Sequence, residues 1–152
     1  MKMQRSQQVT LEIASRLDLL DTVQSVLTHL AALLGFDDDS VHYMGVAVRE
    51  SVINAIKHGN RFDEHKTVVI AFSVGGGEMA IRIRDQGEGF EPGAVRDPLA
   101  DENLLRADGR GMFFMRSFMD LVSYQFPAEG GTEVTLVKKV GSPPVSPSGG
   151  KR

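Results

Sequence analysis

Residues 49–60 read RESVINAIKHGN, and the interpretation of the whole chain begins with this stretch. Glu50 and Asn54 are four positions apart, so they lie on one face of a helix, with Lys57 and His58 on roughly the same side. The remaining positions are mostly apolar, which is typical of an ordinary amphipathic helix with a solvated stripe. A functional interpretation competes with that one, because an Asn oxygen suits Mg²⁺ and a Glu carboxylate can accept a proton.

A second polar stretch, Asp85-Gln86-Gly87-Glu88-Gly89-Phe90, follows directly on a predicted strand. Asp and Gly form turns readily, so a plain turn is one interpretation. Two glycines also let the backbone approach a flat ligand closely. An Asp at the end of a strand can accept a hydrogen bond from an exocyclic amine, such as that of adenine. The stretch is therefore a candidate nucleobase site as well as a turn.

Two further glycine segments lie nearer the C-terminus. Gly109-Arg110-Gly111 precedes a predicted short helix from Met112 to Met119. Free amides at a helix start bind anions such as phosphate, although glycine also serves there as a capping residue. Gly130-Gly131-Thr132 opens the last predicted strand and by itself indicates a turn. Neither segment alone decides between binding and structure.

Hydrophobic periodicity predicts two longer helices and five strands around these segments. Alternating apolar residues, or in residues 67–74 a β-branched and apolar run, predict strands near residues 9–14, 67–74, 79–84, 121–126 and 132–137. Helical spacing predicts one helix from about Val23 to Gly35 and another from about Val41 to His58. Asp37-Asp38-Asp39-Ser40 supplies capping side chains for the second helix, and Gly59-Asn60 stops it. Helices packed on such strands predict an α+β fold, a two-layer α/β sandwich.

The composition is that of an ordinary globular domain: 152 residues, 41% hydrophobic, 24% charged, net charge −3 and no cysteine. We see no basic patch and no apolar run close to the roughly 20 residues that span a bilayer. We therefore expect a cytoplasmic protein that binds neither nucleic acid nor membrane. We expect a single domain over residues 1–140 and a disordered tail over residues 141–152. No P-loop pattern is present, and Gly75 to Ala80, which formally fits a dinucleotide pattern, lies between two strands.

The order of these segments resembles the GHKL superfamily of ATPases, which includes gyrase, histidine kinases and MutL. The matching stretches span about residues 9–139 and comprise an N box (49–60), a first glycine box (85–90), a second glycine box (109–112) and a threonine-containing strand (131–134). Within the superfamily the chain is most similar to bacterial anti-sigma-factor serine kinases. It is a minimal domain, its N box carries Glu50 before Asn54, and residues 109–124 are similar to that group's stretch after the second glycine box. We see no phospho-accepting helix before the domain and no transducer domain after it, which argues against a complete histidine kinase and against a gyrase or MutL subunit.

This resemblance implies a Bergerat ATP-binding fold, with a mixed, mostly antiparallel sheet and helices on one face. It implies that Asn54 ligates Mg²⁺, that Glu50 activates the acceptor hydroxyl, and that Asp85 reads the adenine amino group with Thr132 nearby. The residues that it places against the nucleotide and its phosphates are Gly87, Gly89, Gly109 and Gly111, with Arg110 within reach of a phosphate and an ATP lid over about residues 91–108. Asn60 is not mapped onto the motif.

The resemblance further implies an ATP-dependent serine/threonine protein kinase. Such a kinase binds a sigma factor, phosphorylates a small antagonist protein, and forms a homodimer through its sheet. Two other functions fit the same motifs. One is a regulatory module that binds ATP and acts by contact alone, and the other is a detached histidine kinase catalytic domain that needs a separate His-bearing partner. Phosphoserine survives acid and phosphohistidine does not, so acid stability of the product separates the kinase types.

Overall fold

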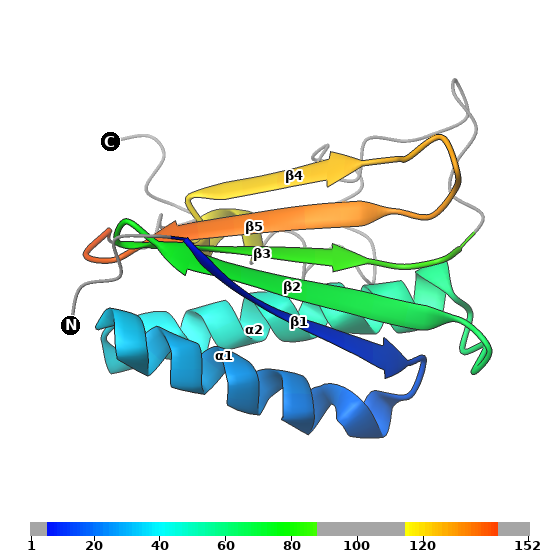
Figure 1. Ribbon diagram of the computed structural model, residues 1–152, viewed down its shortest axis with the longest axis horizontal. Helices are drawn as coiled ribbons and strands as arrows, with labels where there is room; N and C mark the ends of the chain where they lie inside the picture. Colours follow the sequence, from blue (N-terminus) through cyan, green and yellow to red (C-terminus); the bar gives the residue numbers. More distant parts are fainter. Residues whose placement is uncertain (1–5, 88–114, 143–152) are drawn as a thin grey trace.

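The computed structural model describes residues 6–87 and 115–142, which form a sheet covered by helices on one face. The elements in chain order are β1 (Gln7–Ala14), η1 (Leu17–Leu19), α1 (Leu20–Leu34), α2 (Asp38–Asn54), η2 (Ala55–Gly59), β2 (Thr67–Gly75), β3 (Glu78–Arg84), β4 (Leu121–Gln125) and β5 (Glu133–Lys139). A short helical segment covers residues 115–118. The strands form one sheet in the order β1-β2-β3-β5-β4. Figure 1 shows α1 and α2 side by side against one face of this sheet, and no described helix on the other.

The core lies between the helices and the sheet because the strands alternate apolar and polar residues. Ile70 of β2 and Ile81 and Ile83 of β3 are at most 1% exposed, whereas Arg82 between the two isoleucines of β3 points away from the helices and is exposed. Burying each such aliphatic side chain stabilises the fold by about 1.5–3 kcal/mol. The helices complete the core with Val23, Leu27, Leu30, Met44, Ala47, Val48 and Val52.

Helix α1 is the most apolar helix in the described part of the chain. It ends at Gly35, whose left-handed φ of 90° closes the last turn. The segment Leu17–Leu34, with a mean hydropathy of 1.3, is long and apolar enough to cross a membrane by length and composition. This finding corrects our expectation that no run approaches that size. Core helices of globular domains pass the same test, and Val23, Leu27 and Ala31 are fully buried under the sheet.

Helix α2 begins at Asp38 rather than at the predicted Val41. Asp37 alone acts as the N-cap, and its Oδ1 accepts a hydrogen bond from the Ser40 N–H at 2.7 Å. That bond lowers the pKa of the Asp37 carboxyl. Asp38 and Asp39 therefore join the first turn of the helix, where acidic side chains interact favourably with the helix dipole.

The α-helical part of α2 ends at Asn54 rather than at the predicted His58. It continues as η2, a π-helical turn, in which the Asn60 N–H donates to the carbonyl of Ala55 at 2.8 Å. Residues 61–62 then adopt left-handed φ values of 53° and 60°, a conformation that is strained for side chains other than glycine. Single π-helical turns are frequent at functional sites, and η2 directly follows Asn54 of the N box.

The predicted α+β two-layer sandwich is confirmed. All four strand pairings in the described ranges are antiparallel. The predicted helix 112–119 is helical over 115–118, and residues 112–114 lie outside the described residues. The predicted lid and the tail beyond Ser142 lie outside them as well.

Candidate functional site

The carboxylate of Asp85 is the centre of the site. Asp85 directly follows β3, is 5% exposed, and pairs with Thr132 just before β5. Its backbone N–H donates to the Thr132 carbonyl at 3.1 Å, and its Oδ1 accepts from the N–H groups of Gly87 at 2.9 Å and Thr132 at 3.1 Å. Burial raises the pKa of the Asp85 carboxyl, and the two backbone N–H groups oppose that rise. The fold therefore holds a buried carboxyl group in one orientation.

Three glycines pack so closely around Asp85 that no other residue fits. A Cβ atom on Gly59 would lie closer than 3.0 Å to the Asp85 carboxylate, and one on Gly131 equally close to the Asp85 carbonyl. A Cβ on Gly87 would collide with the backbone of Gly59. Gly131 also adopts a left-handed φ of 85°. These close approaches require glycine, since any side chain would push one of the backbone segments away.

Asn60 is a buried residue that hydrogen-bonds to three segments around the site. It is 1% exposed, its Nδ2 donates to Ser15 Oγ at 2.9 Å and to the Thr67 carbonyl at 3.0 Å, and its Oδ1 accepts from the Gln86 N–H at 2.7 Å. Ser15 Oγ donates in turn to the Lys66 carbonyl at 2.7 Å. One buried amide therefore connects the end of β1, the start of β2 and the residue after Asp85.

The other predicted polar residues lie on α2. Glu50 and Asn54 are both half-buried. The Nδ2 atom of Asn54 is buried and has no hydrogen-bond partner among residues 6–87 and 115–142. Between them, Ser51 donates from its Oγ to the Met115 sulfur at 2.9 Å. That contact ties α2 to the helical segment that follows the second glycine box.

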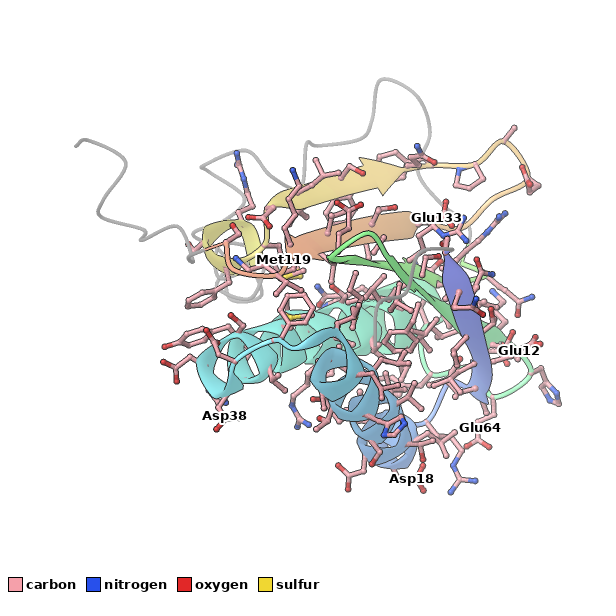
Figure 2. The ribbon with its side chains drawn as sticks, turned by 60° about the vertical axis from the view of Figure 1, so that its left-hand side comes forward. Glu12, Asp18, Asp38, Glu64, Met119 and Glu133 are labelled. Atoms are coloured by element: carbon pink, nitrogen blue, oxygen red, sulfur yellow. The ribbon has the colours of Figure 1, made fainter. Side chains whose placement is uncertain are left out.

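Two methionines of that segment fix its position. Met115 is fully buried and Met119 is 3% exposed. Figure 2 labels Met119, which belongs to the core between the sheet and the helices. The aromatic ring of Phe118 stacks on Tyr43 of α2, with ring centroids 4.0 Å apart. The start of the described segment is therefore anchored on the helix that carries Glu50 and Asn54.

A hollow of about 580 Å³ lies on the helix-free face of the sheet. Its lining includes Val69, Arg82 and Glu133, which Figure 2 labels at the start of β5, and it reaches Asp85 and Gly87 at its edge. Neither Glu50 nor Asn54 lines it. The hollow is therefore on the opposite side of the sheet from the polar stripe of α2, and it is not the site that the motifs predict.

The structure brings together part of the predicted site. Asp85, Gly87 and Thr132 are in direct contact, and Asn54 ends the helix whose π-turn reaches Asp85. The predicted residues Gly89, Gly109, Arg110 and Gly111 lie outside the described residues.

Sequence reasoning missed three residues of this site. The sequence pattern indicates a helix stop at Gly59 and Asn60 and a turn at Gly131, and the resemblance includes them in its motifs without assigning them a role. All three contact Asp85 or the residue after it. The signal in the sequence is their position, because Gly59 and Asn60 are the last two residues of the N box and Gly131 directly precedes Thr132.

Comparisons with known proteins identify the family of this chain. The model of the histidine kinase-like ATPase domain family matches residues 13–138. The anti-sigma F factor of Clostridium perfringens is 36% identical over 96 residues, which cover 62% of this chain and 69% of that protein. The serine-protein kinase RsbW of Listeria innocua is 20% identical over 138 residues, 87% of both chains.

A solved structure shares the fold. The crystal structure of the RsbU and RsbW domains of a Mycobacterium tuberculosis protein superposes with a TM-score of 0.61 at 20% identity. The match covers 92% of this chain and 33% of that larger chain. Because the family model matches most of its length, the chain belongs to the histidine kinase-like ATPase family, in the group that contains anti-sigma factors and serine-protein kinases.

Proposed function

We propose that this protein binds Mg-ATP and transfers the γ-phosphoryl group to a serine or threonine of an antagonist protein, while it also binds a sigma factor. The observation that carries the nucleotide site is the buried Asp85 carboxylate, held by two backbone N–H groups and enclosed by three glycines. A buried acceptor in a glycine cradle suits a flat ligand with an exocyclic amine, as adenine is. The names of the relatives support the sigma factor and the serine kinase activity.

The described residues also fit a magnesium ion. A buried amide group without a hydrogen-bond partner is costly, and Asn54 is the described residue that carries one. The nitrogen and oxygen of an Asn amide exchange places by a simple rotation, so a hard cation bound by the oxygen would satisfy this group. Mg²⁺, when bound with ATP, supplies neutralisation of the phosphate charge.

Glu50 lies one turn before Asn54 on the same face of α2. We assign to it the role of general base. The acceptor hydroxyl oxygen forms a bond to the γ-phosphorus, its proton passes to Glu50, and the bond from the γ-phosphorus to the bridging oxygen breaks as ADP leaves. Most of the rate then comes from positioning and from charge neutralisation.

Nucleotide binding is tested by thermal unfolding with and without Mg-ATP, in the wild type and in Asp85→Asn. Ligand at about 100 times its Kd adds roughly 2.7 kcal/mol, which raises the Tm by several degrees for a domain of this size. We expect this rise in the wild type and its loss in Asp85→Asn. No rise in the wild type at millimolar Mg-ATP contradicts the kinase proposal.

Phosphoryl transfer is tested separately with Glu50→Gln and labelled ATP. We expect this variant to keep the Mg-ATP-induced rise in Tm and to lose most of the transfer to candidate antagonist proteins, a loss of about 10²–10⁴-fold for a general base. Transfer at the wild-type rate contradicts the role of Glu50. Label that is lost in acid identifies a phosphohistidine and a histidine kinase domain, and binding without any transfer identifies a regulatory module.

Two further properties belong to the same proposal. We propose that the protein acts in the cytoplasm, where sigma factors work. We also propose a homodimer that pairs through the helix-free face of the sheet, the face on which Ser73, Ala80 and Val137 lie in register across β2, β3 and β5.

A further inference from the structure

We propose that Asn60 is a positioning residue for base recognition: through the Gln86 N–H it sets the orientation of the Asp85 carboxylate and thereby the preference for ATP over GTP. This inference rests on the proposed function, because it assigns a role at the nucleotide site. Asn60 itself does not touch the base in this scheme. It acts through the backbone that follows Asp85.

The first step of the argument is that Asn60 is fully constrained. Both hydrogens of its amide are donated, to Ser15 Oγ and to the Thr67 carbonyl, and its oxygen accepts from the Gln86 N–H. The side chain is 1% exposed, so water does not compete for these bonds. An amide with both hydrogens and its oxygen engaged cannot rotate without breaking a bond. Asn60 is therefore a rigid reference point.

The second step follows the chain from Asn60 to the carboxylate. The 2.7 Å bond from Gln86 N–H to Asn60 Oδ1 fixes the peptide between Asp85 and Gln86. The Gln86 side chain adds a second anchor, because its Oε1 accepts from the Thr67 N–H at 2.6 Å. With residue 86 held at both ends, the next N–H, that of Gly87, is aimed at Asp85 Oδ1 at 2.9 Å. Asn60 therefore sets the position of one of the two donors that orient the carboxylate, the other being the Thr132 N–H.

The third step concerns the ligand. Adenine offers an amine hydrogen at the position where guanine offers a carbonyl oxygen, so a fixed carboxylate attracts the first and repels the second. A carboxylate free to turn loses part of that discrimination, because a misplaced acceptor forms a weaker hydrogen bond. Loss of the Asn60 side chain should therefore weaken ATP binding and reduce the difference in affinity between ATP and GTP.

Ser15 offers a matched control. It is buried in the same network at 2% exposure and bonds both Asn60 and Lys66, but it makes no bond to residues 85–87 among the described contacts. Ser15→Ala removes two bonds of the network, to Asn60 and to Lys66, and leaves the Asn60 bond to Gln86 in place. It therefore reports the effect of destabilising this corner of the fold without releasing Asp85.

The experiment is calorimetric titration of Mg-ATP and Mg-GTP into the wild type, Asn60→Ala and Ser15→Ala, with the Tm of each protein. We expect both variants to have a lower Tm. Asn60→Ala should bind ATP at least tenfold more weakly and prefer ATP over GTP at least fivefold less than the wild type. Ser15→Ala should stay within twofold of the wild type in both measures.

Each other result is decisive. If Asn60→Ala has a lower Tm but binds ATP with wild-type affinity and keeps the wild-type preference for ATP over GTP, the positioning role is overturned. Equal changes in nucleotide affinity in Ser15→Ala and Asn60→Ala also overturn it, because the effect then comes from destabilising the hydrogen-bond network as a whole. If Asn60→Ala does not fold, Asn60→Ser replaces it, since its shorter side chain cannot span to Gln86, and failure of both to fold overturns the specific role. A wild type that binds neither nucleotide removes the proposed function itself, and this inference with it.

Discussion

At the scale of single residues, the properties of Asp85 link stability to ligand binding. Burial raises the pKa of its carboxyl group, so the folded chain binds this proton more tightly than the unfolded chain. As pH rises from the ordinary pKa through the raised one, this group therefore lowers the free energy of unfolding. ATP binding has the opposite dependence, because only the ionised carboxylate is a pure acceptor for the adenine amine.

The prediction is two opposite pH profiles from one group. Between about pH 4 and the raised pKa, ATP affinity should increase with pH while the Asp85 contribution to stability decreases. The measurement is the Kd for Mg-ATP and the free energy of unfolding across pH 4–8, in the wild type and in Asp85→Asn. The variant should lack the stability profile of this group and should be more stable than the wild type at neutral pH without ligand. A wild-type Kd that is constant over this range contradicts the assignment.

Residue identity was predictable from the sequence only where the spacing itself is the signal. Glu50 and Asn54 are four residues apart, and Asp85 directly follows a predicted strand; both facts can be read from the sequence alone. The roles of Gly59 and Asn60 depend on contacts with residues 85 and 86, which are remote in sequence. No local pattern shows that a helix-ending Gly-Asn pair will meet a particular carboxylate after folding.

At the scale of elements, the junction of α2, η2 and β3 depends on one close approach. The sequence predicts a helix that runs to His58 because Gly59-Asn60 is a helix stop. The π-turn was not predictable, since the change in hydrogen-bond register accompanies the packing of Gly59 against Asp85 and the burial of Asn60. Tertiary contacts thus decide how this helix ends.

Gly59 of η2 and Gly45 of α2 provide a matched pair of variants. Gly59→Ala forces a methyl group into the Asp85 carboxylate, and overpacking of this kind costs about 1–3 kcal/mol. A Cβ atom at Gly45 comes close to the end of the flexible Gln24 side chain and makes an ordinary van der Waals contact with Leu27. The better helix propensity of Ala offsets the contact with Gln24, so the stability of Gly45→Ala should stay within about 1 kcal/mol of wild type. Denaturant unfolding measures both. Gly59→Ala should also lose the Mg-ATP-induced rise in Tm, which Gly45→Ala should keep; equal behaviour of the two contradicts the close approach.

At the scale of the whole molecule, the two-layer architecture was predictable because helix and strand periods differ and the strands alternate cleanly. The order of the strands was not read from periodicity, since β3 pairs with β5 and not with β4, its successor along the chain. That order places Asp85 next to Thr132, because Asp85 directly follows β3, Thr132 directly precedes β5, and the two strands are antiparallel neighbours. Strand order, rather than local sequence, therefore assembles the site.

Among residues 6–87 and 115–142 no helix lies on one face of the sheet, and the proposed homodimer would cover that face. Ala80 lies on β3 opposite Ser73 of β2 and Val137 of β5, near the middle of this face. Ala80→Arg places a charged side chain there, and burying an unpaired charge in an interface is strongly unfavourable. Ala32→Arg is the matched control, because Ala32 is exposed on α1 in the other layer. In sedimentation velocity, the wild type and Ala32→Arg should be dimers and Ala80→Arg a monomer whose Tm no longer depends on protein concentration. A monomeric wild type, or a dimer that survives Ala80→Arg, excludes pairing through this face.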